Sequence, residues 1–436
     1  MKYESVTDLI GDTPLLKIDE EVTGLENIEV YVKLEYYNPF GSIKDRVAWE
    51  LVREDIDRIK EKDQTLLESS SGNTAKAVQG IAGANNLEFK TITNRIKVDE
   101  VKDILITMGT DIKELPGKSE CPDPNDPDDP LTYLDRLMAR ERDKYFRTGQ
   151  YTNERNTEVH RRETGKEILD DLGKVDYLFG GLGTTGSTKG TAKALKEENP
   201  KLEVTGIVSS QDDFIPGIRN ANEMWEVGLY EKELYSDRAV IDSKDALEGM
   251  LTLIRECGVL AGPTTGANFI ALKRKLSKID TELEEQKTAV FFACDRFEHY
   301  LSYIKKRKPE IFGGEEKQGI ETLTEQELEE VPEISVDKAE EWIQEERPVI
   351  VDSRSNPAYQ MAHIPGSINI PEEKLKEVIE SGKPFSEEQK ILLVCPGGRK
   401  TRKFAALLQR KGMKAYSLKE GITGWREQGI NLNSIN

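Results

Sequence analysis

The chain has 436 residues, of which 81 are acidic and 62 basic, and its formal net charge is −19. This length predicts about three domain-sized units and allows large buried cores. The acidic surplus argues against nucleic-acid binding and favours solubility. The sequence shows neither a signal-peptide pattern nor a long apolar run, so we expect a cytoplasmic protein that does not enter a membrane.

Cysteines and histidines are few and scattered. The four cysteines never form a Cys-x-x-Cys pair, and there are only three histidines. These counts argue against a zinc site and against a disulfide framework. We therefore expect no metal centre.

Strand-like and helical patterns alternate from the start of the chain to about residue 312, as a parallel α/β sheet requires. An early strand of alternating pattern places Val30, Val32 and Leu34 on one face. Further strands are predicted at 175–179, 203–208 and 288–294, and helices at 74–84 and 187–198.

Residues 116–130 interrupt this pattern with five prolines among several aspartates. Such a proline density excludes a helix or a central strand. We interpret the stretch as a solvated surface loop, and a lid over an active site is the alternative.

A second α/β pattern begins near residue 336. The preceding stretch, about 309–335, is rich in glutamate and weakly patterned, although 324–330 could form a short helix. Beyond it, strands are predicted at 348–352 and 390–394, and a helix at 402–411 that Gly412 caps. These patterns predict three parts: a first domain at 1–312, a linker at 313–335 and a second domain at 336–436.

Lys44 is the most informative residue of the first domain. It lies in the run Asn38-Pro-Phe-Gly-Ser-Ile-Lys-Asp-Arg46, at the turn between a strand and an amphipathic helix. Most lysines are solvated surface charges, but a tight turn at the start of a helix is a common place for a functional group. A lysine amine can bond covalently to the aldehyde of pyridoxal phosphate (PLP), which acts as an electron sink. Once released by the substrate, the amine can act as a general base at Cα.

Two further polar loops follow strand-like stretches. The loop Gly183-Thr184-Thr185-Gly186-Ser187 offers backbone amides and hydroxyls at the start of a helix, which suits a phosphate group. It lacks the acidic residue about twenty positions on that a nicotinamide site would require. The loop Ser70-Ser71-Gly72-Asn73-Thr74 opens another helix, and its hydroxyls and amides suit a carboxylate. Either loop alone could be an ordinary helix cap.

Together these motifs resemble the β-family of PLP enzymes, the cysteine synthases and cystathionine β-synthases. The resemblance covers about residues 5–305 in register. It implies a fold type II PLP enzyme of two subdomains, similar to the tryptophan synthase β subunit, within the α/β class. The segments that carry it are 10–15, 32–46, 153–160, 164–168, 262–267 and 295–302.

The resemblance also implies a role for each matching residue. Lys44 would hold PLP, Asn73 would bond the ring hydroxyl, and the Thr264 hydroxyl would meet the pyridine nitrogen. Gly183, Thr184, Thr185, Gly186 and Ser187 would hold the phosphate. Ser70, Ser71, Asn73 and Thr74 would receive the substrate carboxylate.

The chain departs from the family pattern at several of these positions. Thr185 stands where the family usually has glycine, Ser70 replaces a threonine, and the loop around Thr264 has threonines in place of serines. These changes keep the hydroxyls, so cofactor binding should survive. Residues 91–109 and the proline-rich stretch differ more, and they occupy the part that selects substrate in the family.

Cys395 is the candidate nucleophile of the second domain. It begins the loop Cys395-Pro-Gly-Gly-Arg399-Lys400-Thr401 between a strand and a helix, where loop amides, the helix dipole and the two cations would favour an anionic sulfur. A small buried hydrophobe is the ordinary interpretation of a lone cysteine, and it suits Cys257 and Cys294 better than Cys395.

Residues 336–432 resemble a single rhodanese domain. The family's motifs match Asp352-Ser-Arg354, Ala362–Ser367, Gly421 and Trp425, with Ala362 in place of a glycine. The resemblance implies a persulfide carrier at Cys395, assisted by Arg399 and Lys400.

The sequence therefore predicts a PLP-dependent cysteine synthase fused to a sulfurtransferase. An O-activated serine, acetyl or phosphoryl, would exchange its β-substituent for sulfur. The alternatives are β-elimination of cysteine to sulfide and pyruvate, cystathionine formation with homocysteine, and a regulatory or scaffold module on an inactive PLP fold. The expected partners are an amino-acid substrate, a sulfur donor and, by resemblance, a second copy of the chain in a homodimer.

Overall fold

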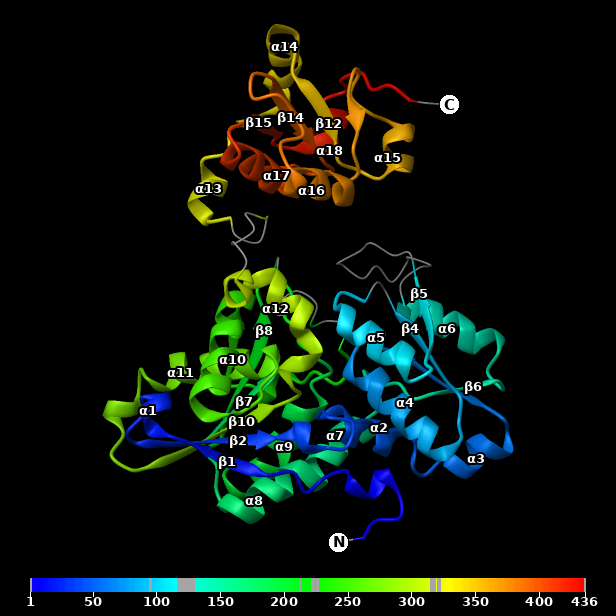
Figure 1. Cartoon of the computed structure of the whole chain (residues 1–436), viewed down its shortest axis with the longest axis vertical. Helices are drawn as coiled ribbons and strands as arrows, with labels where there is room; N and C mark the ends of the chain where they lie inside the picture. Colours follow the sequence, from blue (N-terminus) through cyan, green and yellow to red (C-terminus); the bar gives the residue numbers. More distant parts are fainter. Residues whose placement is uncertain are drawn as a thin grey trace. The chain divides into compact units, whose positions relative to one another are not determined.

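The computed structural model describes residues 2–93, 96–115, 130–211, 213–220, 224, 227–313, 319 and 323–434. The chain divides into two compact units, residues 1–307 and 308–436 (Figure 1). Of the proline-rich stretch 116–130, residues 116–129 lie outside the described residues, and helix α6 begins at the last residue, Pro130. Within the described chain, no helix is both long enough and apolar enough to cross a membrane.

The first unit contains two sheets. The larger has the strand order β1-β2-β10-β7-β8-β9, with only β1 antiparallel to its neighbour, and the smaller has the all-parallel order β5-β4-β3-β6. The strands are β1 (Leu15–Ile18), β2 (Ile28–Leu34), β3 (Thr65–Ser69), β4 (Phe89–Thr93), β5 (Asp111–Glu114), β6 (Tyr145–Arg147), β7 (Tyr177–Gly181), β8 (Glu203–Ser209), β9 (Asp237–Ile241) and β10 (Lys287–Ala293).

Helices cover these sheets. The α-helices are α1 (Glu20–Thr23), α2 (Lys44–Val52), α3 (Ile56–Glu61), α4 (Asn73–Asn85), α5 (Asp99–Thr107), α6 (Pro130–Arg140), α7 (Arg155–Val159), α8 (Lys166–Leu172), α9 (Gly186–Glu198), α10 (Ser243–Cys257), α11 (Pro263–Leu276) and α12 (Leu301–Arg307). A π-helix spans His160–Gly165, and short 3-10 helices include Val6–Leu9, Glu35–Tyr37, Lys232–Leu234, Asp280–Glu282 and Phe297–Tyr300.

The larger sheet is buried on both faces because successive side chains of a strand point to opposite sides. On β10, Phe292 packs with residues of α8 and α9, such as Ile168 and Leu195. Its neighbour Phe291 lies 5.8 Å, centroid to centroid, from Phe269 of α11. Helices on both faces are the arrangement that the alternating sequence pattern predicted.

The second unit is a five-stranded parallel sheet in the order β11-β15-β14-β12-β13. Ile391 and Leu393 of β14 pack towards α16 and α17, whereas Leu392 and Val394 pack towards α14 and α18. The elements are β11 (Glu333–Ile334), β12 (Val349–Asp352), β13 (Ile368–Asn369), β14 (Lys390–Val394), β15 (Lys414–Leu418), α13 (Glu325–Glu329), α14 (Val336–Glu346), α15 (Asn356–Met361), α16 (Glu372–Ser381), α17 (Arg399–Arg410), α18 (Gly421–Glu427) and a 3-10 helix at Pro309–Phe312.

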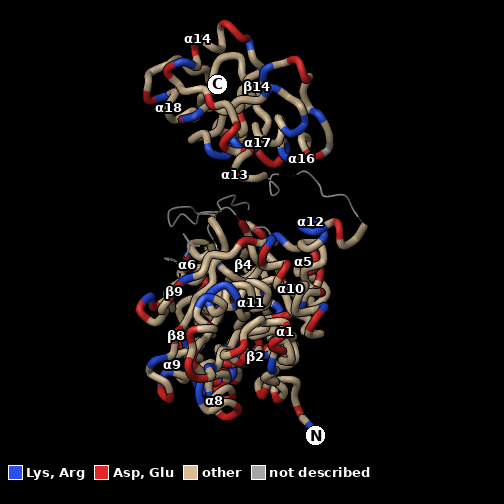
Figure 2. Tube along the Cα trace, turned by 90° about the vertical axis from the view of Figure 1, so that its left-hand side faces the viewer, with Lys and Arg blue, Asp and Glu red and all other residues tan. Residues whose placement is uncertain are grey.

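The start of the second unit differs from the sequence expectation. The described residues from 323 to 335, expected to be linker, pack on this unit through Leu323, Leu328 and Val331. The short helix that the sequence allowed at 324–330 forms as α13, with Thr324 and Glu327 in a reciprocal cap. Figure 2 shows acidic and basic residues interspersed along each unit.

Candidate active site

A cavity that is partly open to solvent lies in the first unit, where the carboxyl ends of β7 and β10 meet the starts of α2, α4, α9 and α11. Ligands of open α/β sheets bind at this edge. The cavity brings together seven residues expected from the sequence, and it adds others. Its lining is Ile43, Lys44, Asn73, Gly181, Gly183, Thr184, Thr185, Ser187, Gly217, Thr264, Cys294 and Asp295.

Lys44 is the first residue of α2 and lines the cavity. The turn before it is fixed to the end of β10, because the Ile43 amide donates to the Cys294 carbonyl at 2.9 Å. Burial lowers the pKa of Lys44, against the smaller effects of Cys294 and Asp295. A lower pKa increases the fraction of neutral amine, which is the nucleophilic form.

The loop after β7 forms the wall at the start of α9. Thr185 has φ +65°, a left-handed conformation that favours glycine, and this explains why the related family usually has glycine there. Thr185 is buried, and Oδ1 of Asn156 has no hydrogen-bond partner among the residues that the structure describes. Gly186 does not line the cavity, but a Cβ there would lie 2.1 Å from Asn156 Oδ1. The glycine therefore allows the close approach that shapes this loop.

The second polar loop lies at the start of α4, but some of its side chains are already hydrogen-bonded. The Ser70 hydroxyl accepts from the amides of Gly72 and Ala75 at 3.3 Å, and the Thr74 hydroxyl donates to Gln150 at 2.7 Å. Ser71 is exposed. Of the four residues expected to receive a carboxylate, only Asn73 lines the cavity.

Asn73 connects the cavity to a buried carboxyl group. Its Nδ2 donates to Asp295 Oδ2 at 2.5 Å and to the Tyr300 hydroxyl at 3.3 Å. Tyr300 also donates to Asp295, and Oδ1 of Asp295 has no hydrogen-bond partner within the described part of the chain. Burial raises the pKa of Asp295, and the bonds from Tyr300 and Asn73 only partly offset this effect.

Thr264 faces the same cavity from the first turn of α11. Its hydroxyl donates to the Pro216 carbonyl. The next residue, Thr265, accepts instead from the Cys294 amide at 3.2 Å. The two threonines of this loop therefore have different roles.

Sequence reasoning did not identify Cys294 and Asp295 as cavity residues. Cys294 was expected to be an inert buried hydrophobe, yet it lines the cavity beside Lys44. Burial, helped by Asp295, raises the pKa of its thiol to about 12, so it remains neutral. One signal was available in the sequence: both residues directly follow the central strand 287–293, at the edge where ligands bind.

In the second unit, Cys395 follows β14 and its loop opens α17. Its sulfur lies 3.4 Å from the Thr401 hydroxyl, and the residue is only 2 % exposed. Cys395 is thus buried, although the sequence analysis judged a small buried hydrophobe to suit this cysteine less well than Cys257 and Cys294. Arg399 and Lys400 are exposed, and Lys400 forms an ion pair with Glu372 at 2.9 Å.

The family comparisons agree with this geometry. Residues 6–295 match the family described as pyridoxal-phosphate dependent enzyme, and residues 335–428 match the rhodanese-like domain. The chain belongs to the PLP-dependent enzymes. It also carries a C-terminal rhodanese-like domain. The expectation of a fold type II PLP enzyme followed by a small rhodanese-like α/β domain is thus confirmed.

Three similar proteins illustrate the relationship. A cysteine synthase from Staphylococcus aureus is 29 % identical over 310 residues, covering 69 % of this chain and 96 % of that protein. Cysteine synthase B from Pseudomonas aeruginosa is 29 % identical over 305 residues, covering 69 % and 97 %. The structure of a hydrogen sulfide-producing enzyme from Fusobacterium nucleatum is 30 % identical, covers 69 % of this chain and 99 % of its own, and gives a TM-score of 0.60.

The residues of the cavity fit PLP. The helix start at Gly186 and the buried Thr185 hydroxyl offer donors to a phosphate, and Lys44 lies in the same cavity with a lowered pKa. Thr264 and Asn73 line the same cavity.

Proposed function

We propose that the first unit makes L-cysteine by β-replacement, from an O-activated serine and a sulfur nucleophile. The relatives named cysteine synthase support this activity. The observation that carries the proposal is the cavity that joins Lys44 to the loop at the start of α9. When bound, PLP would withdraw electrons from Cα of the substrate and so permit loss of the β-substituent.

Each polar residue of the cavity has a proposed task. Lys44 would bond covalently to the cofactor and, once freed, remove the Cα proton through its Nζ. Gly183, Thr184, Thr185, Gly186 and Ser187 would hold the phosphate, Thr264 the pyridine nitrogen and Asn73 the ring hydroxyl. The start of α4, at Ser70, Ser71, Asn73 and Thr74, would hold the substrate carboxylate.

The net reaction balances without an oxidant. The Cα–H bond and the Cβ–O bond break, the leaving group departs with its electron pair, and a Cβ–S bond forms with hydrosulfide. The α proton returns to Cα, so cysteine and the acetate or phosphate anion are the products. Lys44 is the residue that would carry the proton in both directions.

Reduction with borohydride followed by peptide mapping tests the site. We expect the pyridoxyl group on Lys44. Lys76 is the informative competitor, because burial lowers its pKa as well. A label on Lys76, or no label, would contradict the assignment. Cysteine formation from O-acetylserine or O-phosphoserine with sulfide, measured by product mass, then tests the activity.

We further propose that the rhodanese-like unit carries sulfane sulfur as a persulfide on Cys395, aided by Arg399 and Lys400. Release of that sulfur as sulfide requires two electrons from a small thiol, which becomes a disulfide. Sulfur transfer from thiosulfate to cyanide, lost in a Cys395→Ser variant, tests the carrier. A cytoplasmic location and a homodimer complete the proposal, and light scattering of the purified protein tests the dimer.

β-Elimination of cysteine is the second candidate activity. It is favoured by one comparison, the hydrogen sulfide-producing enzyme that is 30 % identical to this chain. Pyruvate formed from cysteine alone, without a second substrate, would identify this reaction.

A further inference from the structure

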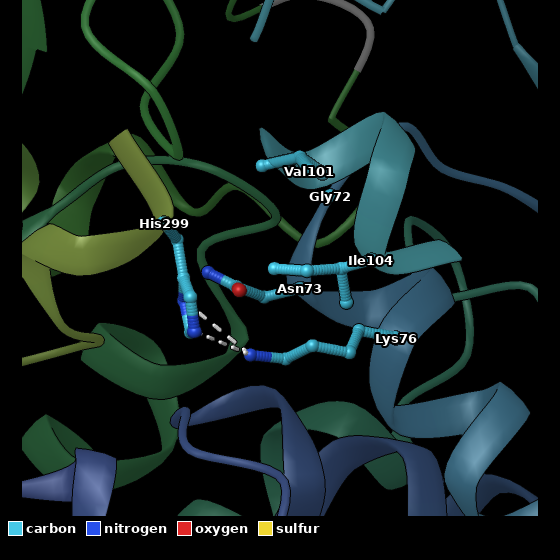
Figure 3. Close-up of a pocket in the computed structure, with 6 residues that line it drawn as sticks. All are labelled: Gly72, Asn73, Lys76, Val101, Ile104 and His299. Carbon is cyan, nitrogen blue, oxygen red and sulfur yellow. Dashed lines mark hydrogen bonds between the residues drawn. The ribbon is translucent and has the colours of Figure 1, made fainter. Parts of the chain in front are cut away.

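A narrow hollow, open to solvent, lies beside the cofactor cavity. Asn73 lines both spaces, so they adjoin at the start of α4. Figure 3 shows the Lys76 side chain extending from α4 towards His299, below Asn73 and Ile104. The lining residues are Gly72, Asn73, Lys76, Val101, Ile104 and His299.

Lys76 has an unusual environment for a lysine. It is only 8 % exposed, on a helix whose neighbouring residues Ala75 and Ala77 are fully buried. Its Nζ lies 3.4 and 3.5 Å from the two ring nitrogens of His299. Within the described residues, no carboxylate lies within ion-pair distance of this ammonium. Buried lysines are ordinarily paired, but Lys76 has no ion-pair partner there. Burial lowers its pKa, and the charges of Asp45 and Asp295 offset this effect only in part.

The nearest acidic groups are occupied elsewhere. Asp45 accepts from the Phe40 amide at 2.6 Å and from the Ser42 hydroxyl at 3.1 Å, and burial raises its pKa to about 7. Asp295 accepts from Asn73 and Tyr300, and its pKa is raised by burial. Both carboxyls are therefore poorly suited to neutralise Lys76. An anion that enters the pocket could do so.

His299 completes the polar side of the pocket. Burial, and secondarily the charge of Lys76, lower the pKa of His299 to about 4. The ring is therefore neutral near pH 7 and carries one N–H donor. An ammonium and a neutral imidazole together offer donors to a small oxyanion without adding a second positive charge.

We propose that Lys76 and His299 form a subsite for an anionic group on the β-substituent of the amino-acid donor, which makes the donor a phosphate monoester of serine. The inference rests on the proposed β-replacement. A carboxylate held at the start of α4 would place the serine side chain near Asn73. Lys76 lies three residues further along this helix, about 4.5 Å along its axis and on the same side. A neutral acetyl ester offers no charge to Lys76, whereas a phosphate offers two.

Kinetics of the PLP-loaded full chain provide the first test. With sulfide as acceptor, Lys76→Met should lower kcat/KM for O-phosphoserine about 10- to 100-fold, the loss expected for one charge-assisted hydrogen bond. The value for O-acetylserine should change less than about threefold, and Lys76→Arg should restore most of the activity with O-phosphoserine. Lys62→Met is the matched control, because Lys62 is exposed and its loss changes the net charge equally.

The outcomes separate clearly. Equal losses with both donors would overturn the subsite, since Lys76 would then act on the fold or on the chemistry common to both. The subsite would also be overturned if Lys76→Met lowered kcat/KM only with a carboxylate-bearing thiol acceptor, such as homocysteine, and not with the phosphorylated donor. His299→Gln should lower kcat/KM for O-phosphoserine more than kcat/KM for O-acetylserine.

Calorimetry with inorganic phosphate is the second readout. The PLP-loaded protein should bind phosphate, and Lys76→Met should abolish this binding while Lys62→Met retains it. Binding that depends on Lys76, without cysteine formation from either donor, would preserve the subsite and overturn the proposed function. Cysteine formation without Lys76-dependent phosphate binding would overturn the subsite alone.

Discussion

At the scale of single residues, the loop 183–187, which we propose to hold the phosphate, depends on how closely its backbone approaches one side chain. Gly186 begins α9 directly against the side chain of Asn156, whose Nδ2 donates to the Gln150 carbonyl at 2.8 Å and to the Thr184 hydroxyl at 3.0 Å. Asn156 thus joins the loop to the segment before α7. This packing leaves no space for a methyl group.

We expect Gly186→Ala to destabilise the protein by about 1–3 kcal/mol and to weaken PLP binding, because the new Cβ would meet Asn156 Oδ1 at 2.1 Å. Urea unfolding of the cofactor-free protein and fluorescence titration with PLP measure the two effects. Gly83→Ala is the control. Nothing lies within 4 Å of a Cβ at that helical position, so this variant should gain up to about 1 kcal/mol. Equal behaviour of the two variants would contradict the packing argument.

The sequence singles out Lys44 as a candidate, but it does not single out Lys76. Lys44 stands out because its turn is rich in proline and glycine, which is a local signal. Lys76 carried a weaker local signal, a lysine among small apolar residues of one helix. Its meaning depends on His299, which is 223 positions away in the sequence. Contacts between residues so far apart in the sequence are set by the fold, and the spacing of nearby residues does not predict them.

At the scale of elements, a buried ionic cluster attaches the N-terminal strands to α2 and α8. Arg46 donates to Glu35 at 2.9 Å and to both oxygens of Glu167, at 2.6 and 2.7 Å. Lys33 pairs with Glu167 at 2.7 Å. The Thr13 hydroxyl joins the cluster by donating to Glu35 at 2.7 Å. Removing one member would leave charges buried without partners, which is costly.

This cluster predicts a pH dependence. Burial alone would raise the pKa of Glu167, but the bonds from Arg46 and Lys33 outweigh it and hold the value at about 2, below the 4.5 of a free side chain. A depressed pKa stabilises the folded state above about pH 4.5, and this contribution, about 3 kcal/mol, is lost as the pH falls towards 2. The Glu167→Gln variant lacks this stabilising contribution at every pH.

Urea titrations at a series of pH values check this expectation. The difference in free energy of unfolding between the original chain and Glu167→Gln should be largest above pH 5 and should shrink steadily between pH 5 and 3. Glu158→Gln, at a half-exposed position on α7, should differ from the original chain by less than about 0.5 kcal/mol. A difference for Glu167→Gln that stays constant with pH would contradict the ionic origin.

Sequence periodicity predicted the strands and helices well, with boundaries shifted by a few residues. The helix expected at 402–411 begins earlier, at Arg399, because Gly398 at φ +82° starts the turn directly after the cysteine loop. The strand expected at 175–179 instead spans Tyr177–Gly181, since its pairing with β8 continues through two glycines. Contacts with neighbouring segments set the ends of these elements, so the sequence pattern of one segment does not reveal them.

At the scale of the whole molecule, each unit has a separate core. The first has a core around β7 and β10, and the second buries both faces of β14. The composition of the segment near residue 320 predicted the division only approximately. Apolar residues there, such as Leu328 and Val331, are too sparse for a periodic signal, yet they complete the core of the second unit.

Separate cores predict separable activities. Cys395→Ser should abolish sulfur transfer from thiosulfate to cyanide by at least about 1,000-fold, since it removes the only proposed nucleophile of that unit, and should leave cysteine formation from free sulfide within about twofold. Lys44→Ala should abolish cysteine formation from free sulfide and leave sulfur transfer from thiosulfate to cyanide within about twofold.

When thiosulfate and a small thiol replace sulfide, cysteine formation should require both Cys395 and Lys44. An equal mixture of the two variants should restore it if the sulfur is released as free sulfide, because either unit can then serve the other. A full rate with thiosulfate in Cys395→Ser alone would contradict the carrier role, since the sulfur would then reach the PLP site without this cysteine.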